Sequence, residues 1–183
     1  LQALLETYQV PFVGHSHSCC KWMFRKHQAA ETLRGHGFPT LPQAILSYEQ
    51  KDQLQVIERF FRQNFLQRAI VKPTIGGSSI GVYSVSTPQE AYVKAQEIFA
   101  RKLDGRVLIE PFCEGKEFTI VVLENGKGEP VALVPTEVEV NDEQDQIFDF
   151  RKKYLPTNQA AYHTPPRFSQ AVVGHIRMQA EQI

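Results

Sequence analysis

Apolar side chains recur at helical spacing along several segments of the chain. In residues 51–65, Leu54, Ile57, Phe61 and Phe65 fall on one face, which predicts an amphipathic helix that covers a sheet. The same kind of pattern predicts further helices in residues 1–5, 25–34, 87–103 and 169–183.

Segments rich in β-branched and aromatic residues alternate with these helices and predict strands. They are residues 10–14, 43–48, 69–72, 80–85, 107–112, 117–123 and 131–140. Residues 69–72 and 80–85 predict a hairpin with a Gly/Ser tip, and the last three segments predict an antiparallel meander. Because no βαβαβ alternation is present, we expect an α/β protein of the α+β type rather than a doubly wound dinucleotide-binding fold.

The charge balance and the cysteines exclude some classes of protein. Lys and Arg total 20, as do Asp and Glu, so no net field would attract nucleic acid or an anionic membrane. The apolar stretches are too short to span a bilayer, and the first residues lack a signal pattern. Three cysteines, two of them adjacent, make a poor disulfide framework. We therefore expect a soluble, cytoplasmic protein that binds neither nucleic acid nor membrane.

The Gly/Ser tip of the predicted hairpin has the composition of a phosphate-binding loop. Residues without bulk let backbone N–H groups converge on an anion, and the hydroxyls of Ser78 and Ser79 add donors. It is not a Walker loop, because Lys72 precedes the glycines and a strand, not a helix, follows them. The alternative is an ordinary hairpin tip with no ligand.

Two further features could complete a nucleotide site. Glu110 ends one predicted strand and Glu117 begins the next, where a carboxylate can accept hydrogen bonds from an adenine amine or a ribose hydroxyl, and Phe112 could pack on a base. Residues 148–154 form a basic and aromatic run that could carry a lysine to a phosphate. Taken singly, these groups are typical of solvated strand ends and of a solvated loop.

Together these strings resemble the D-alanine–D-alanine ligase family of the ATP-grasp superfamily. The resemblance lies in the residues, order and spacing of Ile70-Val71-Lys72-Pro73, Gly77-Ser78-Ser79-Ile80-Gly81, Leu108-Ile109-Glu110, Gly115-Lys116-Glu117-Phe118-Thr119 and Lys153-Tyr154-Leu155. It extends upstream to residues 10–14 and Lys26, and so covers essentially the whole chain. It implies an ATP-grasp fold, in which two small α+β subdomains with antiparallel sheets clamp a nucleotide.

The resemblance also implies a division of the chain into three segments. Residues 1–20 would be the end of an N-terminal domain, and residues 21–103 the central subdomain with a Gly-rich lid. Residues 104–183 would be part of the C-terminal subdomain. No helix cap precedes residues 1–5 and no stop signal follows residues 169–183, so we expect a chain cut at both ends.

The matching positions imply a set of phosphate contacts. Lys26 and Lys72 would bind the α- and β-phosphates through charge-assisted hydrogen bonds, and the loop of Gly77, Ser78 and Ser79 would cover them.

The base and the ribose would be bound by residues from the next two strands. Glu110 would take the adenine amine, the backbone of Phe112 and Cys113 would pair with the ring edge, and Glu117 would hold the ribose.

The resemblance implies a ligase reaction. ATP would phosphorylate the carboxylate of D-alanine, and the amine of a second D-alanine would attack the acyl phosphate, giving D-alanyl-D-alanine for peptidoglycan synthesis. Lys153 would reach the γ-phosphate, and Tyr154 and Ser78 would shape the amino-acid site as further catalytic residues. Mg²⁺, or alternatively Mn²⁺, would screen the transferred phosphate. ATP and D-alanine are the expected small-molecule partners, and a homodimer is an expected assembly.

Some positions depart from the family pattern. Arg25 and Gly76 stand where acidic residues are usual, and Phe148 stands where a tyrosine is usual. We expect the metal ligands beyond Ile183 and therefore predict that the isolated segment is inactive. Three alternatives stay open: an ATP-grasp ligase with a different acceptor, a non-catalytic nucleotide-binding domain, and an α+β domain that binds no nucleotide.

A separate cluster has the chemistry of metal ligands. It consists of His15, His17, Cys19 and Cys20. Because no second cluster at metal spacing accompanies it, a surface loop is the more economical interpretation than a zinc site.

Overall fold

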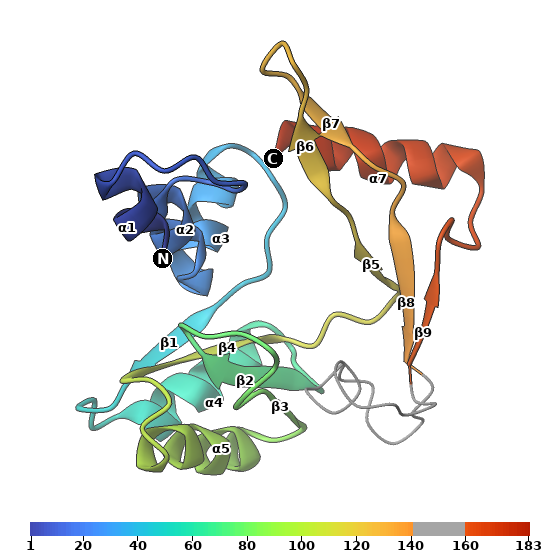
Figure 1. The fold of residues 1–183 in the computed structure, drawn as a ribbon. Coiled ribbons are helices and arrows are strands. Elements are labelled where there is room, and N and C mark those ends of the chain that lie inside the picture. The colour runs from blue at the N-terminus through green and yellow to red at the C-terminus, as the bar shows by residue number, and fades with distance from the viewer. Residues whose placement is uncertain (141–159) are drawn as a thin grey trace. The chain divides into compact units, whose positions relative to one another are not determined.

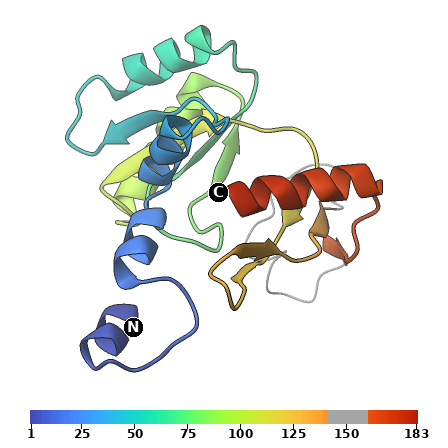
Figure 2. The ribbon, with the colours of Figure 1, turned by 90° about the horizontal axis from the view of Figure 1, so that it is seen from above.

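A computed structural model of the chain describes residues 1–140 and 160–183. The chain divides into two compact units, Leu1–Phe112 (unit 1) and Cys113–Ile183 (unit 2). Both units combine helices with antiparallel strands, as Figures 1 and 2 show. The boundary between the units follows strand β4 (Arg106–Pro111), whereas the boundary predicted from the sequence, at residue 104, precedes this strand. The assignment of the three segments to ligase subdomains stays a prediction.

Unit 1 begins with three helices and continues with a four-stranded sheet and two further helices. Its elements are α1 (Gln2–Thr7), α2 (His17–Met23), α3 (Lys26–Gly35), β1 (Ala44–Ser47), α4 (Gln53–Gln63), β2 (Ala69–Pro73), β3 (Tyr83–Val85), α5 (Pro88–Ala100) and β4 (Arg106–Pro111). The strand order is β1-β4-β2-β3, and every neighbouring pair is antiparallel. The predicted hairpin is therefore present as the β2–β3 pair.

The core of unit 1 lies between the sheet and the helix pair α4 and α5, which cover the same face of the sheet (Figure 1). Helix α4 contributes Ile57, Phe60 and Phe61, as expected for an amphipathic helix. Helix α5 is capped by Thr87, whose hydroxyl accepts a hydrogen bond from the N–H of Glu90 at 3.1 Å. Strand β2 alternates, with Ala69, Val71 and Pro73 buried and the residues between them half-buried. This alternation places Ile70 and Lys72 on the face away from α4 and α5.

The described residues of unit 2 form a three-stranded and a two-stranded antiparallel sheet and a 13-residue helix. Its elements are β5 (Glu117–Thr119), β6 (Val122–Glu124), β7 (Pro130–Ala132), β8 (Thr136–Val140), β9 (Ala160–His163) and α7 (Gln170–Gln182). Strands β5, β8 and β9 form one sheet, and β6 pairs with β7 in another. Two hydrogen bonds join helix α7 to Ala132 of β7. The N–H of Ala132 donates to the Glu181 carboxylate at 2.9 Å, and the carbonyl of Ala132 accepts from the Arg177 guanidinium at 2.9 Å.

A buried carboxylate connects β8 to the segment before α7. Glu137 is 1% exposed and accepts hydrogen bonds from the backbone N–H of Arg167 at 3.1 Å and from its guanidinium at 2.8 and 3.2 Å. The same guanidinium lies 2.9 Å from Glu139, which also contacts His163 at 3.1 Å. Because removal of Arg167 would leave the buried charge of Glu137 uncompensated, we expect this contact to stabilise unit 2.

The structure corrects four sequence predictions. Residues 10–14 form no strand, and residues 17–23, expected in a loop, form α2. Strand β4 pairs with β1 and β2 and not with β5, so the meander begins one strand later. Its two long strands are each interrupted, giving the ladders β5–β8 and β6–β7. Pro135 lies at the interruption before β8, where it has no N–H to donate to a ladder.

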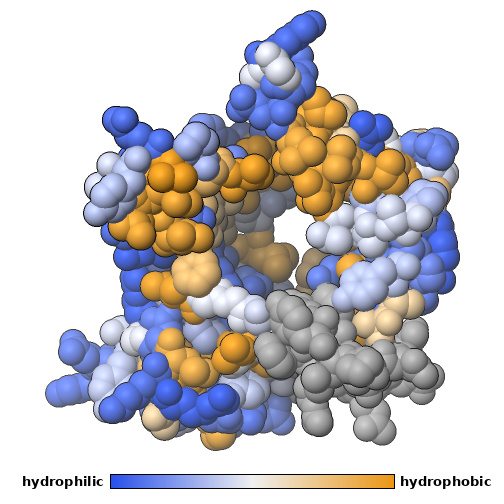
Figure 3. All heavy atoms as spheres, viewed as in Figure 1, coloured by the Kyte–Doolittle hydropathy of each residue, from blue (hydrophilic) through white to orange (hydrophobic). Residues whose placement is uncertain are grey.

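The N-terminal helices α1 and α2 bury no residue. Apolar side chains, including Leu4, Val13, Met23 and Phe24, are exposed in this part of unit 1, and Figure 3 shows apolar surface there. None of the described strands pairs with residues 10–14, where a strand was expected.

Within the described ranges, no helix has both the length and the apolar character needed to cross a membrane.

Gly81, in the turn before β3, is predicted to be sensitive to substitution. Its φ is +72°, and an added Cβ would lie 2.8 Å from Leu103 Cδ1 and 3.1 Å from Pro73 Cγ. We expect Gly81→Ala to lower the free energy of unfolding by about 1–3 kcal/mol through backbone strain and crowding. Gly105→Ala is the control, because no atom lies within 4 Å of its added Cβ. Urea unfolding of both variants tests this, and equal stabilities would contradict it.

The Glu137–Arg167 contact predicts a pH dependence. Hydrogen bonds from the Arg167 side chain, aided by its backbone N–H, hold the pKa of Glu137 at about 2, below the ordinary 4.5. A depressed carboxyl pKa contributes stability above pH 4.5 that is lost as the pH falls towards 2. We expect Arg167→Gln to be less stable at pH 7 and to lose less stability over this acid range.

Urea unfolding followed by circular dichroism between pH 7 and about 2.5 measures this difference. Arg59→Gln, at an exposed position of α4, is the control and should follow the wild-type profile. Parallel profiles for wild type and Arg167→Gln would show that the contact does not set the acid response.

Candidate functional site

Lys26 lies at the start of α3 and reaches the Gly-rich segment, defined here as residues 73–81. Its ammonium donates to the carbonyl oxygens of Pro73 at 3.2 Å and Gly76 at 2.9 Å. Its backbone N–H donates to the carbonyl of Thr74 at 3.1 Å. The next residue, His27, is 5% exposed, so the start of α3 is packed against the rest of unit 1. Lys26 therefore contacts two residues that lie 47 and 50 positions after it in the sequence.

Lys72 lies on β2, directly before the Gly-rich segment, and forms an ion pair with Glu110 of β4. The register pairs Ile70 with Glu110 and Lys72 with Leu108, so the two charged side chains share a face of the sheet. The side chains are 19% and 14% exposed, which leaves part of each accessible to solvent.

The two lysines lie close enough to affect one another. Burial lowers the pKa of Lys26, the charge of Lys72 lowers it further, and the carboxylates of Asp104 and Glu110 act in the opposite direction. Two neighbouring ammonium groups could bind an anion, because a bound anion would relieve their repulsion. This is the chemistry that a nucleotide phosphate requires.

The Gly-rich segment has an unusual backbone. Ser78 and Ser79 both have positive φ angles, 55° and 56°, and Gly76 and Gly81 have φ angles of 118° and 72°. Non-glycine residues seldom adopt this region, so two in succession mark a constrained turn. Turn hydrogen bonds run from the N–H of Ile80 to Gly77 at 3.2 Å and from the N–H of Val82 to Ser79 at 3.3 Å. They explain why β3 begins at Tyr83 rather than at residue 80, as the sequence predicted.

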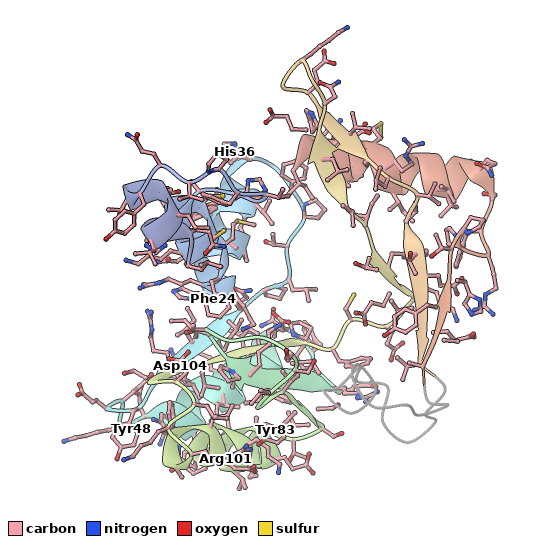
Figure 4. All side chains as sticks on the ribbon, in the orientation of Figure 1. Phe24, His36, Tyr48, Tyr83, Arg101 and Asp104 are labelled. Carbon is pink, nitrogen blue, oxygen red and sulfur yellow. The ribbon has the colours of Figure 1, made fainter. Side chains whose placement is uncertain are left out.

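Asp104, in the turn between α5 and β4, fastens the start of the Gly-rich segment. Its Oδ2 accepts hydrogen bonds from the Thr74 hydroxyl at 2.7 Å and from the N–H of Ile75 at 2.9 Å, and its Oδ1 accepts from the N–H of Arg106 at 3.1 Å. Burial alone would raise the pKa of Asp104, but these hydrogen bonds outweigh it and the pKa is lowered. Asp104 therefore stays ionised at neutral pH. Figure 4 labels it at the part of the sheet nearest the N-terminal helices.

Phe112 follows β4 and is held from one side. Its N–H donates to the carbonyl of Arg68 at 3.0 Å, and the Arg68 guanidinium lies 3.9 Å from the centroid of its ring. This is a cation–π contact. A base could therefore pack only on the other face of the Phe112 ring.

The structure brings some of the predicted site residues together and places others separately. Within unit 1, Lys26 contacts the Gly-rich segment that holds Gly77, Ser78 and Ser79, and Lys72 pairs with Glu110. Phe112 lies two residues after Glu110 and contacts Arg68. Cys113 and Glu117 are exposed residues of unit 2, with Glu117 opposite Val138 in the β5–β8 ladder. Their approach to Lys72 stays a prediction. Phe148, Lys153 and Tyr154 lie outside the described residues.

Sequence reasoning missed three residues that support the site: Thr74, Arg68 and Asp104. Asp104 precedes Gly105 after a helix, which is typical of any turn. No local signal separated it from a solvated turn residue, because its partners at Thr74 and Ile75 lie about thirty positions upstream.

Among the residues that the structure describes, no three His, Cys, Asp or Glu side chains gather as a metal site. Cys20 instead contacts Gln2 at 3.7 Å and the carbonyl of His15 at 3.5 Å. The cluster of His15, His17, Cys19 and Cys20 thus lies at and just before α2 and has no metal-binding geometry.

Comparisons with known proteins give this site a family. Residues 33–183 match the family model described as D-ala D-ala ligase C-terminus. The D-alanine–D-alanine ligase of Prosthecochloris aestuarii is 33% identical over 183 residues, covering 98% of this chain and 48% of that protein. The D-alanine–D-alanine ligase of Corynebacterium aurimucosum is 31% identical over 182 residues, covering 98% and 49%. The chain thus spans about half the length of the curated relatives it matches.

Solved structures share the fold. The D-alanine–D-alanine ligase of Coxiella burnetii matches with a TM-score of 0.73 and 25% identity, over 98% of this chain and 44% of that one. The biotin carboxylase domain of the Hydrogenobacter thermophilus 2-oxoglutarate carboxylase, solved with MgADP, matches with a TM-score of 0.74 and 16% identity, over 99% and 38%. These likenesses and the antiparallel sheets confirm the predicted α+β ATP-grasp fold. The family model and the two relatives show that this chain belongs to the D-alanine–D-alanine ligase family, where it corresponds to the C-terminal part.

Proposed function

We propose that this chain is the nucleotide-binding part of an ATP-dependent carboxylate–amine ligase that forms D-alanyl-D-alanine. The observation that carries the proposal is the approach of Lys26 and Lys72 to the Gly-rich segment in unit 1. Membership of the ligase family supports the choice of D-alanine as substrate and of peptidoglycan synthesis as the purpose.

The phosphates of ATP would bind at the Gly-rich segment. The ammonium of Lys26 would contact one phosphate and that of Lys72 another, in charge-assisted hydrogen bonds. An arriving phosphate would compete with Glu110 for Lys72, and the Glu110 carboxylate would then be available to an adenine amine. The exposed face of Phe112 would contact the base.

The remaining contacts would come from residues whose placement around the nucleotide is inferred from the family likeness. Glu117 would hold the ribose, and the Cys113 backbone would meet the ring edge. Lys153 would reach the γ-phosphate, with Tyr154 and Ser78 at the amino-acid site. These groups would orient the D-alanine carboxylate for attack on the γ-phosphate.

Mg²⁺, or Mn²⁺ in its place, would neutralise charge on the transferred phosphate when bound. The described residues contain no group of three metal-ligating side chains, so none of them is assigned to the metal. The work of this part of the chain is to bind and orient the phosphates.

We place the protein in a reducing, cytoplasmic compartment, because Cys19, Cys20 and Cys113 are all unbridged. ATP and D-alanine are its proposed partners. A homodimer stays a prediction from the family likeness.

Activity of the intact protein tests the substrate assignment. With ATP and Mg²⁺, we expect phosphate release to depend on D-alanine and to give D-alanyl-D-alanine, with no release for L-alanine. A panel that includes D-serine separates this from a ligase with another acceptor; release with an acid other than D-alanine would overturn the assignment. Nucleotide binding without turnover with any acceptor would favour a non-catalytic domain.

Binding of Mg-ADP tests the nucleotide site directly. Lys72→Ala removes a charged hydrogen-bond donor and should weaken binding by about 1–3 kcal/mol. Lys51→Ala, at an exposed turn of unit 1, is the matched control and should bind as the wild type does. Calorimetry on the folded proteins measures both, and equal affinities for Lys72→Ala and the control would remove Lys72 from the site.

A further inference from the structure

Asp104 holds the first two residues of the Gly-rich segment beyond β2. Its carboxylate takes three short hydrogen bonds, two of them from Thr74 and Ile75. Thr74 is fully buried, and its N–H donates to the carbonyl of Arg106 at 3.4 Å. The turn at Asp104 and the start of the Gly-rich segment are therefore a single connected structure.

The part of the segment that Asp104 holds is the part that places Lys26. The carbonyl of Thr74 accepts the backbone N–H of Lys26, and the carbonyls on either side, from Pro73 and Gly76, accept its ammonium. These carbonyl positions depend on the conformation of residues 73–76. That conformation is fixed at Thr74 and Ile75 by the Asp104 carboxylate.

The negative charge of Asp104 also favours the charged form of Lys26. Its carboxylate is one of two that offset the repulsion between Lys26 and Lys72, and Glu110 is the other. The Asp104 oxygens accept hydrogen bonds from Thr74, Ile75 and Arg106. In the described contacts, Asp104 forms no ion pair with either lysine, so its charge acts on Lys26 without a direct contact.

We infer that Asp104 is a positioning residue of the phosphate site, which acts through Thr74 and Ile75 to hold Lys26 where a nucleotide phosphate binds. This inference rests on the proposed function. It assigns Asp104 no contact with the nucleotide.

Binding of Mg-ADP and of adenosine to the intact protein tests the inference. Asp104→Asn replaces one acceptor oxygen by an amide donor, and Thr74→Ala removes the hydroxyl that meets Asp104. We expect each variant to bind Mg-ADP about tenfold more weakly and adenosine within about twofold of the wild type. A general structural defect would weaken both ligands together. Thr74→Ser keeps the hydroxyl and should bind Mg-ADP with wild-type affinity.

Asp52→Asn, at a position before α4 where the carboxylate meets only Gln50 in the described contacts, is the matched control and should bind both ligands normally. If Asp104→Asn fails to fold, Thr74→Ala and Thr74→Ser still decide. Wild-type affinity in Thr74→Ala, or an equal loss of adenosine and Mg-ADP affinity, would overturn the inference. Failure of the wild type itself to bind Mg-ADP would overturn the proposed function instead.

Discussion

The site depends on one constraint, the repulsion between Lys26 at the start of helix α3 and Lys72 near the end of strand β2. Burial and the nearby charge of Lys72 both disfavour the charged form of Lys26. Two sets of contacts compensate this repulsion. The carbonyls of Pro73 and Gly76 accept hydrogen bonds from the Lys26 ammonium, and the Glu110 carboxylate pairs with Lys72. These contacts offset the repulsion, and a phosphate bound between the two ammonium groups would offset it further.

The rest of unit 1 serves this arrangement. The α4 and α5 helices cover one face of the sheet and make the core, while Lys72 and Glu110 lie on the other face. Strand β4, between β1 and β2, places Glu110 beside Lys72, and the turn before it places Asp104 beside Thr74. One strand and its preceding turn therefore position the two carboxylates that compensate the lysines.

Local sequence signals predicted much of this fold. The spacing of Ile57 and Phe61 predicted α4, and the glycines after Lys72 predicted the hairpin tip. The partners of β4 could not be predicted in this way, because pairing between strands distant in sequence depends on the packed core rather than on local pattern. Asp104 was missed for a related reason: its role depends on contacts far along the chain. The lysines and Glu110 were recognised because family motifs surround them, whereas α2 has only a Ser16 cap to mark its start.

Lys26 and Lys72 are proposed to bind the phosphates of a nucleotide at the Gly-rich segment. A crystal structure of the intact protein with Mg-ADP is the most direct test of this proposal. We expect phosphate oxygens within hydrogen-bond distance, about 2.7–3.2 Å, of both ammonium groups, with the adenine on the side of Glu110 and Phe112. A nucleotide bound elsewhere, or one whose phosphates touch neither lysine, would contradict it.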